Sequence, residues 1–182
     1  MDRTAVVVPL KDFAAAKSRL RLAGVSRVDE RLREMAAGVL AAARPRPVYV
    51  ACESGEVAAF ALAHGARVLR SDARDLNGAA RHALQALGEE YDFVMFVHGD
   101  IREPQGLGEF IPTATVTIVS DHHGTGTNVL VVPTQVDFRF HYGQGSAQAH
   151  RDEAQRLGLD VDVIVNSPWR FDVDEASDIG SQ

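Results

Sequence analysis

Short apolar runs alternate with segments of helical period along most of the chain, and this alternation constrains the fold more than any other feature of the sequence. Runs that are apolar without interruption predict strands buried on both faces, which is typical of parallel sheets covered by helices. Strands and helices in alternation favour an α/β fold. The strands expected in the first half of the chain are 5–9, 48–52, 67–69 and 93–97.

Helical segments lie between these strands. Ser26 and Asp29 form a capping signal for a helix whose apolar residues share one face as far as Ala43. Ser54 is expected to cap a second helix, and Gly88 to end a third. These second and third helices are expected at 55–63 and 76–87, and a fourth at 146–157. Later strands are expected at 115–119, 128–132, 161–165 and 171–173. No repeat or linker divides them, so we predict one α/β domain over residues 1–182, with a mixed, mostly parallel sheet.

Composition argues against some classes of partner and favours one compartment. The net charge of −6 argues against a nucleic acid or an anionic membrane as the main partner. No apolar run approaches the roughly 20 residues that span a bilayer. Cys52 is the one cysteine, so no intramolecular disulfide can form, which favours a reducing compartment. We therefore expect a cytoplasmic protein.

Three cations follow the first strand. Lys11, Lys17 and Arg19 lie at its carboxyl end, where α/β sheets bind ligands. Lysine supplies a point charge and arginine a bidentate fork, which together suit a polyphosphate. The segment lacks the glycine patterns of a P-loop and of a dinucleotide-binding loop, so side chains are expected to hold the phosphates as much as the backbone. A solvated basic turn is the alternative.

Aspartates near two strand ends form a candidate metal site. Asp100 lies just past the strand 93–97, and we expect its side chain to be exposed at a cleft. Asp172 and Asp174 share one face of an extended segment. Carboxylate oxygens suit Mg²⁺, which completes its shell with phosphate and water. Asp100 as a turn residue and Asp174 as a helix cap are the alternatives. His98 is expected to be a structural residue or to contact the metal ligands without binding the metal itself.

Two polar loops, at 124–128 and 143–146, contain glycines that let backbone N–H groups approach an anion. Ser146 is expected to cap the helix after the second loop, and a phosphate or carboxylate ligand is expected between the two loops. Asn77 has two interpretations: it contacts a base or ribose hydroxyl, or it caps its own helix.

These motifs occur in the same order as in a known family. The segments concerned are 8–11, 15–20, 76–77, 124–128, 138–140 and 172–174, together with Asp100, Gly143 and Ser146. In these the chain resembles the guanylyltransferases of deazaflavin-coenzyme biosynthesis, which couple GTP to 2-phospho-L-lactate, phosphoenolpyruvate or 3-phosphoglycerate. The resemblance runs from the first strand to the last aspartates. It implies a single-domain, Rossmann-like nucleotidyltransferase fold.

The resemblance also implies a role for each candidate residue. Residues expected to bind the nucleotide are Pro9, Leu10, Lys11, Lys17, Ser18, Arg19 and Asn77. Those expected to bind Mg²⁺ are Asp100, Asp172 and Asp174, and those expected to contact the phosphorylated acid are Thr127, Gly143 and Ser146. Lys17, Arg19 and Asp100 are expected to be catalytic.

The reaction implied is attack of the acid's phosphate on the α-phosphorus of GTP, with release of pyrophosphate. A related nucleotidyltransferase with another acceptor or with CTP is one alternative. A nucleotide-binding regulator that has lost catalysis is the other. The sequence leaves the identity of the acid open, and it also leaves a homodimer open.

Overall fold

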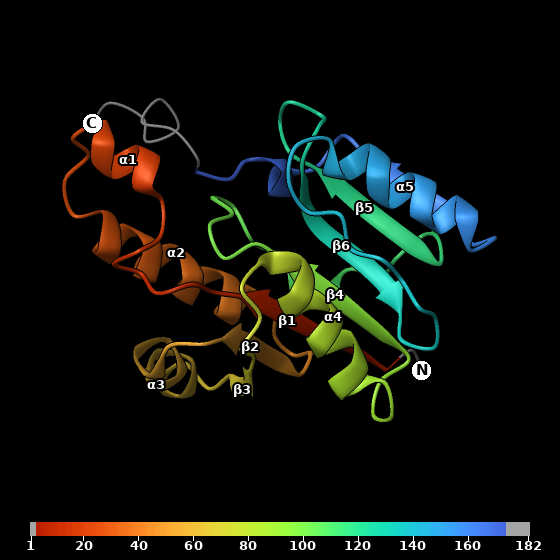
Figure 1. The fold of residues 1–182 in the computed structure, drawn as a ribbon, viewed down its shortest axis with the longest axis horizontal. Helices are drawn as coiled ribbons and strands as arrows, with labels where there is room; N and C mark the ends of the chain where they lie inside the picture. Colours follow the sequence, from red (N-terminus) through yellow and green to blue (C-terminus); the bar gives the residue numbers. More distant parts are fainter. Residues whose placement is uncertain (1–2, 174–182) are drawn as a thin grey trace.

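The computed structural model describes residues 3–173, and one seven-stranded sheet runs through them in the order β3-β2-β1-β4-β6-β5-β7 (Figure 1). Strand β1 lies between β2 and β4 and pairs with both in parallel, and β3 adds in parallel to the outer side of β2. These four strands are Thr4–Pro9 (β1), Val48–Cys52 (β2), Arg67–Arg70 (β3) and Phe93–Val97 (β4).

The other half of the sheet contains the one strand of the seven that runs in the opposite direction. Strand β6 is antiparallel to both β4 and β5, whereas β7 is parallel to β5. These strands are Val116–Ser120 (β5), Thr127–Pro133 (β6) and Val161–Ile164 (β7). The prediction of a mixed, mostly parallel α/β sheet is therefore confirmed.

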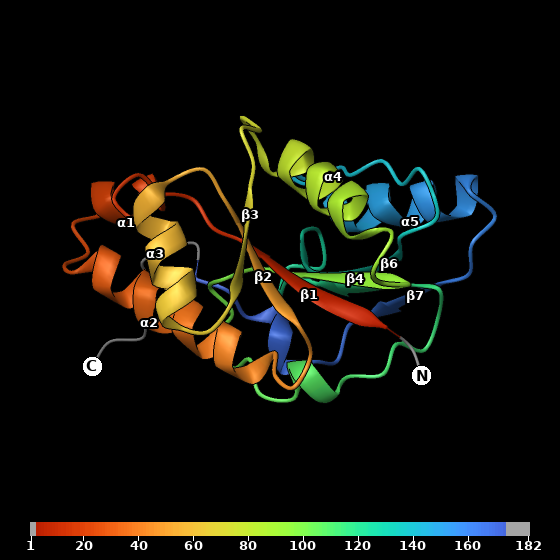
Figure 2. The same ribbon diagram turned by 90° about the horizontal axis from the view of Figure 1, so that it is seen from below.

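Helices cover both faces of the sheet, as Figure 2 shows. They are Ser18–Leu22 (α1), Val28–Ala42 (α2), Gly55–Ala63 (α3), Leu76–Leu87 (α4) and Ser146–Arg156 (α5), with 3-10 turns at Leu107–Glu109 (η1) and Pro168–Arg170 (η2). Along β1, Val6 and Val8 belong to the core cluster that contains residues of α2 and α3, whereas Ala5 and Val7 belong to the cluster that contains residues of α4 and α5. This alternation buries both faces of the strand, which explains its continuous apolar run.

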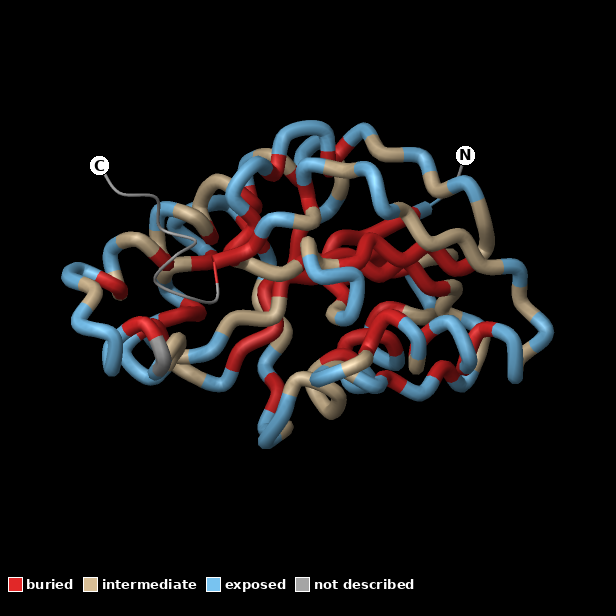
Figure 3. The backbone as a smooth tube through the Cα atoms, turned by 90° about the horizontal axis from the view of Figure 1, so that it is seen from above, coloured by how far each residue is buried: buried red, intermediate tan, exposed pale blue. Residues whose placement is uncertain are grey.

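Burial follows the sheet. In Figure 3 the strands form a continuous buried centre, and exposed segments lie around it. The helices of the part of the chain that is described are all too short or too polar to span a bilayer.

Helix starts agree with the predictions in one case and differ in two. The hydroxyl of Ser54 caps α3 by accepting from the N–H of Glu56 at 3.2 Å. The capping signal at Ser26 is wrong, because α2 begins at Val28 after Arg27, whose backbone is left-handed. Ser146 does not cap α5 either, because the N-cap position is taken by Gly145 in a left-handed conformation. The N–H of Ala147 donates instead to the backbone carbonyl of Thr125 at 3.0 Å.

The last predicted strand is also absent as such. Of 171–173, Asp172 alone pairs, in an isolated antiparallel bridge with Ile101. The N–H of Arg102 also donates to the carbonyl of Phe171 at 2.9 Å. These contacts bring Asp172 beside the segment that follows β4, although they do not form a strand.

The strand order creates a switch point beside β1. The chain passes outward from β1 to β2 and β3 and then returns to β4 on the other side of β1. Loops at the carboxyl ends of β1 and β4 therefore leave in opposite directions, and a crevice opens between them. Ligands of α/β sheets bind at such a point.

Candidate functional site

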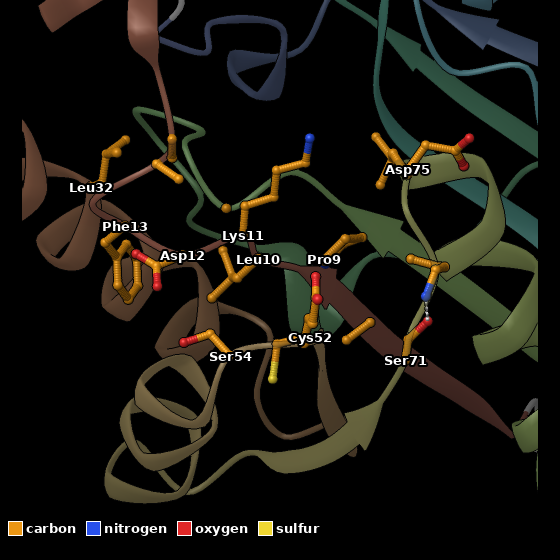
Figure 4. A pocket seen from close by; sticks show the side chains of 18 of the residues that line it. Pro9, Leu10, Lys11, Asp12, Phe13, Leu32, Cys52, Ser54, Ser71 and Asp75 are labelled. Carbon is orange, nitrogen blue, oxygen red and sulfur yellow. Dashed lines mark hydrogen bonds between the residues drawn. The ribbon is translucent and has the colours of Figure 1, made fainter.

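A cavity of about 1000 Å³ lies at the carboxyl ends of β1, β2, β3 and β4. Figure 4 shows Pro9 and Leu10 near its middle, Cys52 and Ser54 at the end of β2, and Ser71 on the segment after β3. The volume is at the upper end of the range for small-molecule sites, so a nucleotide with its phosphates can be accommodated.

The cavity brings together most of the residues predicted to bind a nucleotide. Those in its lining are Pro9, Leu10, Lys11, Lys17 and Ser18, and Asp100 lines it as well. Asn77, Thr127, Gly143, Ser146 and Asp172 are not part of this lining. The backbone of Arg19 lies in α1, but its side chain lies outside what the structure describes.

Lys17 and Asp100 form an ion pair between Nζ and Oδ2. Both side chains are largely covered, with exposed fractions of 20% for Lys17 and 12% for Asp100. Asp100 is therefore buried and not exposed as expected. Lys17 has a φ of 53°, a left-handed conformation that costs a lysine about 1–2 kcal/mol. The pair joins the loop after β1 to the loop after β4, directly across the switch point.

Arg21 fixes the backbone of the basic loop after β1, a role that the sequence did not suggest. Its guanidinium donates to the carbonyl of Phe13 at 2.6 Å and to that of Ala16 at 3.2 Å, and it forms an ion pair with Asp29. A bidentate donor can tie two carbonyls of one loop together. Arg21 thus fixes the loop backbone, which leaves the lysines of the loop facing the cavity.

A second group of ligand atoms gathers beside Lys17. A ring nitrogen of His98 and one carboxylate oxygen from each of Asp100 and Asp172 lie within 4.8 Å of one another. Asp174, the third predicted metal ligand, lies outside the described residues. Two carboxylates with an imidazole form a donor set that fits a divalent cation. The structure therefore brings together two of the predicted metal ligands and adds a histidine that had been expected to be structural.

Asn128 of β6 holds two members of this group in place. Its backbone carbonyl accepts from the N–H of His98 at 3.0 Å, and its side-chain amide donates to Oδ1 of Asp172 at 3.2 Å. The same amide donates to the carbonyl of Trp169 at 3.1 Å. Residues that orient metal ligands in this way are a regular part of metal sites. The antiparallel pairing of β6 with β4 is what places Asn128 there.

The residues expected to contact an acid occupy two different environments. Gly143 is exposed, with a φ of 129° and open space around its Cα. Thr127 and Ser146 are only 2% and 1% exposed, and the Ser146 hydroxyl donates to that of Thr127 at 3.1 Å. Their hydroxyls belong to an internal network that supports the loop carrying Gly143.

Asn77 has a role that neither interpretation anticipated. Its side-chain carbonyl accepts from the N–H of Tyr142 at 2.6 Å, and its amide donates to the carbonyl of Tyr142 at 3.3 Å. The N-cap of α4 is Asp75, which accepts from the N–H of Gly78 at 2.8 Å, so capping by Asn77 is wrong. Asn77 ties the loop around Gly143 to α4 through Tyr142.

His150 is fully buried in α5 and completes the internal network. Its Nε2 accepts from the N–H of His141 at 2.9 Å, so the proton of the neutral ring is on Nδ1, which faces the Thr127 hydroxyl at 3.1 Å. Burial, with smaller contributions from His141 and His98, lowers the pKa of His150 from an ordinary 6.5 to about 3. The native state thus requires a neutral ring.

The free energy of unfolding is therefore expected to decrease on acidification below pH 6.5. The unfolded chain binds a proton at His150 that the native state excludes until about pH 3, so stability is complete above pH 6.5 and is lost as the pH falls through this window. One group contributes at most about 1.4 kcal/mol per pH unit. Urea unfolding between pH 7.5 and pH 5 measures the slope. It should become shallower in His150→Gln and stay unchanged in His82→Gln, whose ring is exposed on α4. A slope in His150→Gln equal to that of the wild type would contradict the assignment of this pH dependence to His150.

A sequence model of the family described as "Guanylyl transferase CofC like" matches residues 4–181. Among solved structures, a nucleotidyl transferase from Methanothermobacter thermautotrophicus has the same fold, with a TM-score of 0.70 at 18% identity, over 98% of this chain and 95% of the other.

Two curated relatives align along most of the chain. One is a 2-phospho-L-lactate guanylyltransferase from Methanothermobacter thermautotrophicus, 29% identical over 98% of this chain and 83% of the relative. The other is a phosphoenolpyruvate guanylyltransferase from Chloroflexus aurantiacus, 29% identical over 93% of this chain and 89% of the relative. Both are named for GMP-transferring activities with a small phosphorylated acid.

Proposed function

Since the chain belongs to the family of CofC-like guanylyl transferases, we propose that it joins GMP from GTP to the phosphate of a small phosphorylated carboxylic acid. The observation that carries the proposal is the Lys17–Asp100 pair at the switch point. Both residues line the cavity, as does His98, and the ligand atoms of His98 and Asp172 lie within 4.8 Å of that of Asp100. The names of the relatives support 2-phospho-L-lactate or phosphoenolpyruvate as the acid, and 3-phosphoglycerate remains a third candidate.

The bonds exchanged in this reaction require little proton transfer. An oxygen of the acid's phosphate forms a bond to the α-phosphorus of GTP, and the bond from that phosphorus to the bridging oxygen of the β-phosphate breaks. Pyrophosphate leaves with the electron pair. Because the attacking phosphate is already ionised, no strong general base is needed, and positioning with charge neutralisation supplies the rate.

The basic loop would contact the triphosphate of GTP. Lys11 is exposed at the cavity and Lys17 faces it from the left-handed turn before α1, so both can reach phosphate oxygens. Arg19 is proposed as a third cation on sequence grounds. Their positive charge would stabilise the negative charge that builds up on the leaving pyrophosphate.

A divalent cation, Mg²⁺ in the first instance, would be held by Asp100 and Asp172, and Asp174 is a further candidate ligand. When bound, such an ion neutralises phosphate charge and aligns attacking and leaving oxygens. Asn128 would keep Asp172 oriented for this purpose through its 3.2 Å hydrogen bond. Lys17 would balance the charge of Asp100 on the side that faces the cavity.

The acid is proposed to lie near the loop that carries Gly143. The open space around this glycine leaves its backbone accessible to a carboxylate or phosphate. Thr127 and Ser146 are proposed to act on the acid through this loop, because their hydroxyls are buried. GTP and phosphorylated acids of this size are metabolites of the cytoplasm, so we propose that compartment for the protein.

Pyrophosphate release tests the proposal. GTP, ATP, CTP and UTP are each combined with phospholactate, phosphoenolpyruvate and the phosphoglycerates, with Mg²⁺ and with chelator. We expect release that needs GTP, one of the acids and the metal together. Nucleotide binding without turnover for every combination would instead support a non-catalytic regulator, and turnover with CTP alone would support the other nucleotidyltransferase alternative.

A further inference from the structure

We propose that His98 is a nitrogen ligand of the metal site, and that the site therefore binds Mn²⁺ and similar first-row ions more tightly than Mg²⁺. The inference rests on the proposed function in that it concerns the same cation site. It adds a residue and a metal preference to the two carboxylates that the sequence suggested.

The first support is the position of the ring. One of its nitrogens lies within 4.8 Å of oxygens from both Asp100 and Asp172. Those two residues come from the loop after β4 and from the distant segment that bridges Ile101, so three side chains from two parts of the chain converge. A convergence of this kind is the geometry that a cation with several protein ligands requires.

The second support is an unsatisfied atom. The Nε2 of His98 is buried, and within residues 3–173 it has no hydrogen-bond partner. A buried polar atom without a partner costs about 1–3 kcal/mol, so proteins rarely keep one without a use for it. A bound cation would satisfy a ring nitrogen that the protein itself leaves unbonded.

The third support is that the histidine is held from two sides. Its backbone N–H is bonded to the carbonyl of Asn128 at 3.0 Å, and its ring lies 5.7 Å from the ring of Tyr142, centre to centre. The backbone of Tyr142 is itself fixed by two hydrogen bonds with the side chain of Asn77, one donated by Asn77 and one by the N–H of Tyr142. The ring is thus positioned by contacts within the protein, and little reorganisation is needed for it to bind a metal.

The metal preference follows from the donor set. Mg²⁺ takes oxygen ligands and tolerates nitrogen poorly, whereas imidazole becomes a better ligand along the series from Mn²⁺ to Co²⁺ and Ni²⁺. Two carboxylates alone would suit Mg²⁺ and Mn²⁺ alike. The added imidazole nitrogen raises affinity for the first-row ions and leaves that for Mg²⁺ nearly unchanged.

Pulsed electron paramagnetic resonance of bound Mn²⁺ tests the inference without any turnover. Mn²⁺ is added alone, in a buffer without nitrogen and without nucleotide. We expect ¹⁴N modulation in the wild-type protein, its replacement by a ¹⁵N pattern when histidine is ¹⁵N-labelled, and its loss in His98→Asn. His82→Asn, which changes an exposed histidine of α4, should keep the modulation. The isotope label makes the test independent of how well the variant folds.

Calorimetric titrations give the second readout. In His98→Asn the affinity for Mn²⁺ should fall about tenfold or more, whereas the affinity for Mg²⁺ changes much less. Mn²⁺ that binds without nitrogen modulation, or equal losses for both ions, would overturn the assignment of His98 and leave the proposed reaction intact. A wild-type protein that binds neither ion, alone or with GTP, would overturn the metal site itself and the inference with it.

Discussion

Asp100→Asn is expected to lower kcat for GMP transfer by at least about a hundredfold, because the substitution removes the negative charge that faces both Lys17 and the metal site. Loss of one well-placed electrostatic group in an active site has effects of this size. The asparagine keeps the shape of the side chain, so the change in rate reports on charge. Pyrophosphate release at saturating GTP and acid is the measurement.

Burial of Asp100 adds a consequence for stability. The carboxylate is largely covered and paired, so the variant leaves the Lys17 ammonium without this partner and should lose about 1–3 kcal/mol in the free energy of unfolding. The rate is therefore compared at a temperature where both proteins are folded. Asp152→Asn, an exposed position on α5, is the matched control and should keep its activity. Near-normal turnover by Asp100→Asn would show that Asp100 is a turn residue and would remove the basis of the metal site.

The sheet was largely predictable, because burial on both faces leaves a direct mark in the sequence. The residues of β1 pack alternately against two helical layers, and a chain that does this must be apolar at every position. The antiparallel direction of β6 leaves no such mark. Strand direction depends on where the connecting segment delivers the chain, and an apolar run reads the same in both directions.

Helix caps were less predictable, because a capping residue works only in one backbone conformation. Ser54 has the extended backbone that lets its hydroxyl reach the helix, and it caps α3. Before α2 and α5 the chain turns through left-handed residues, Arg27 and Gly145, which place the neighbouring serines where they cannot cap. Ser146 then directs its hydroxyl inward to Thr127.

At the candidate site, positions that follow a strand end could be predicted from the sequence, whereas the role of His98, which depends on distant partners, could not. Asp172 also depends on a distant partner, and the family resemblance supplied it. Lys17 and Asp100 could be predicted because both follow central strands of a parallel sheet. The role of His98 at the site depends on Asn128 and Tyr142, which contact it only after the second half of the chain has folded. In the sequence, its nearness to Asp100 was the one available signal.

Lys17→Met is also expected to have a large effect, a reduction of kcat/KM for GTP by about a hundredfold or more. The substitution keeps an unbranched apolar stem and removes the ammonium. This would lose a charge-assisted phosphate contact of about 1.5–3 kcal/mol together with the stabilisation of the leaving group. Arg81→Met, an exposed position on α4, is the control for loss of one positive charge. Initial rates over a range of GTP concentrations separate the effect on kcat from that on KM.

A double-mutant cycle with Asp100→Asn decides whether Lys17 acts on the substrate or only supports Asp100. If Lys17 served the carboxylate alone, the double variant would be no slower than Asp100→Asn. We expect the double variant to be slower by a further tenfold or more, because the ammonium would also contact the triphosphate.

Lys11 and Lys17 are the two lysines of the chain, so reductive ¹³C-methylation gives two lysine signals, one of which disappears in Lys17→Met. The Lys17 signal should shift when GTP is added. A signal that does not move with GTP, in a protein that still turns over, would assign the phosphates to other cations.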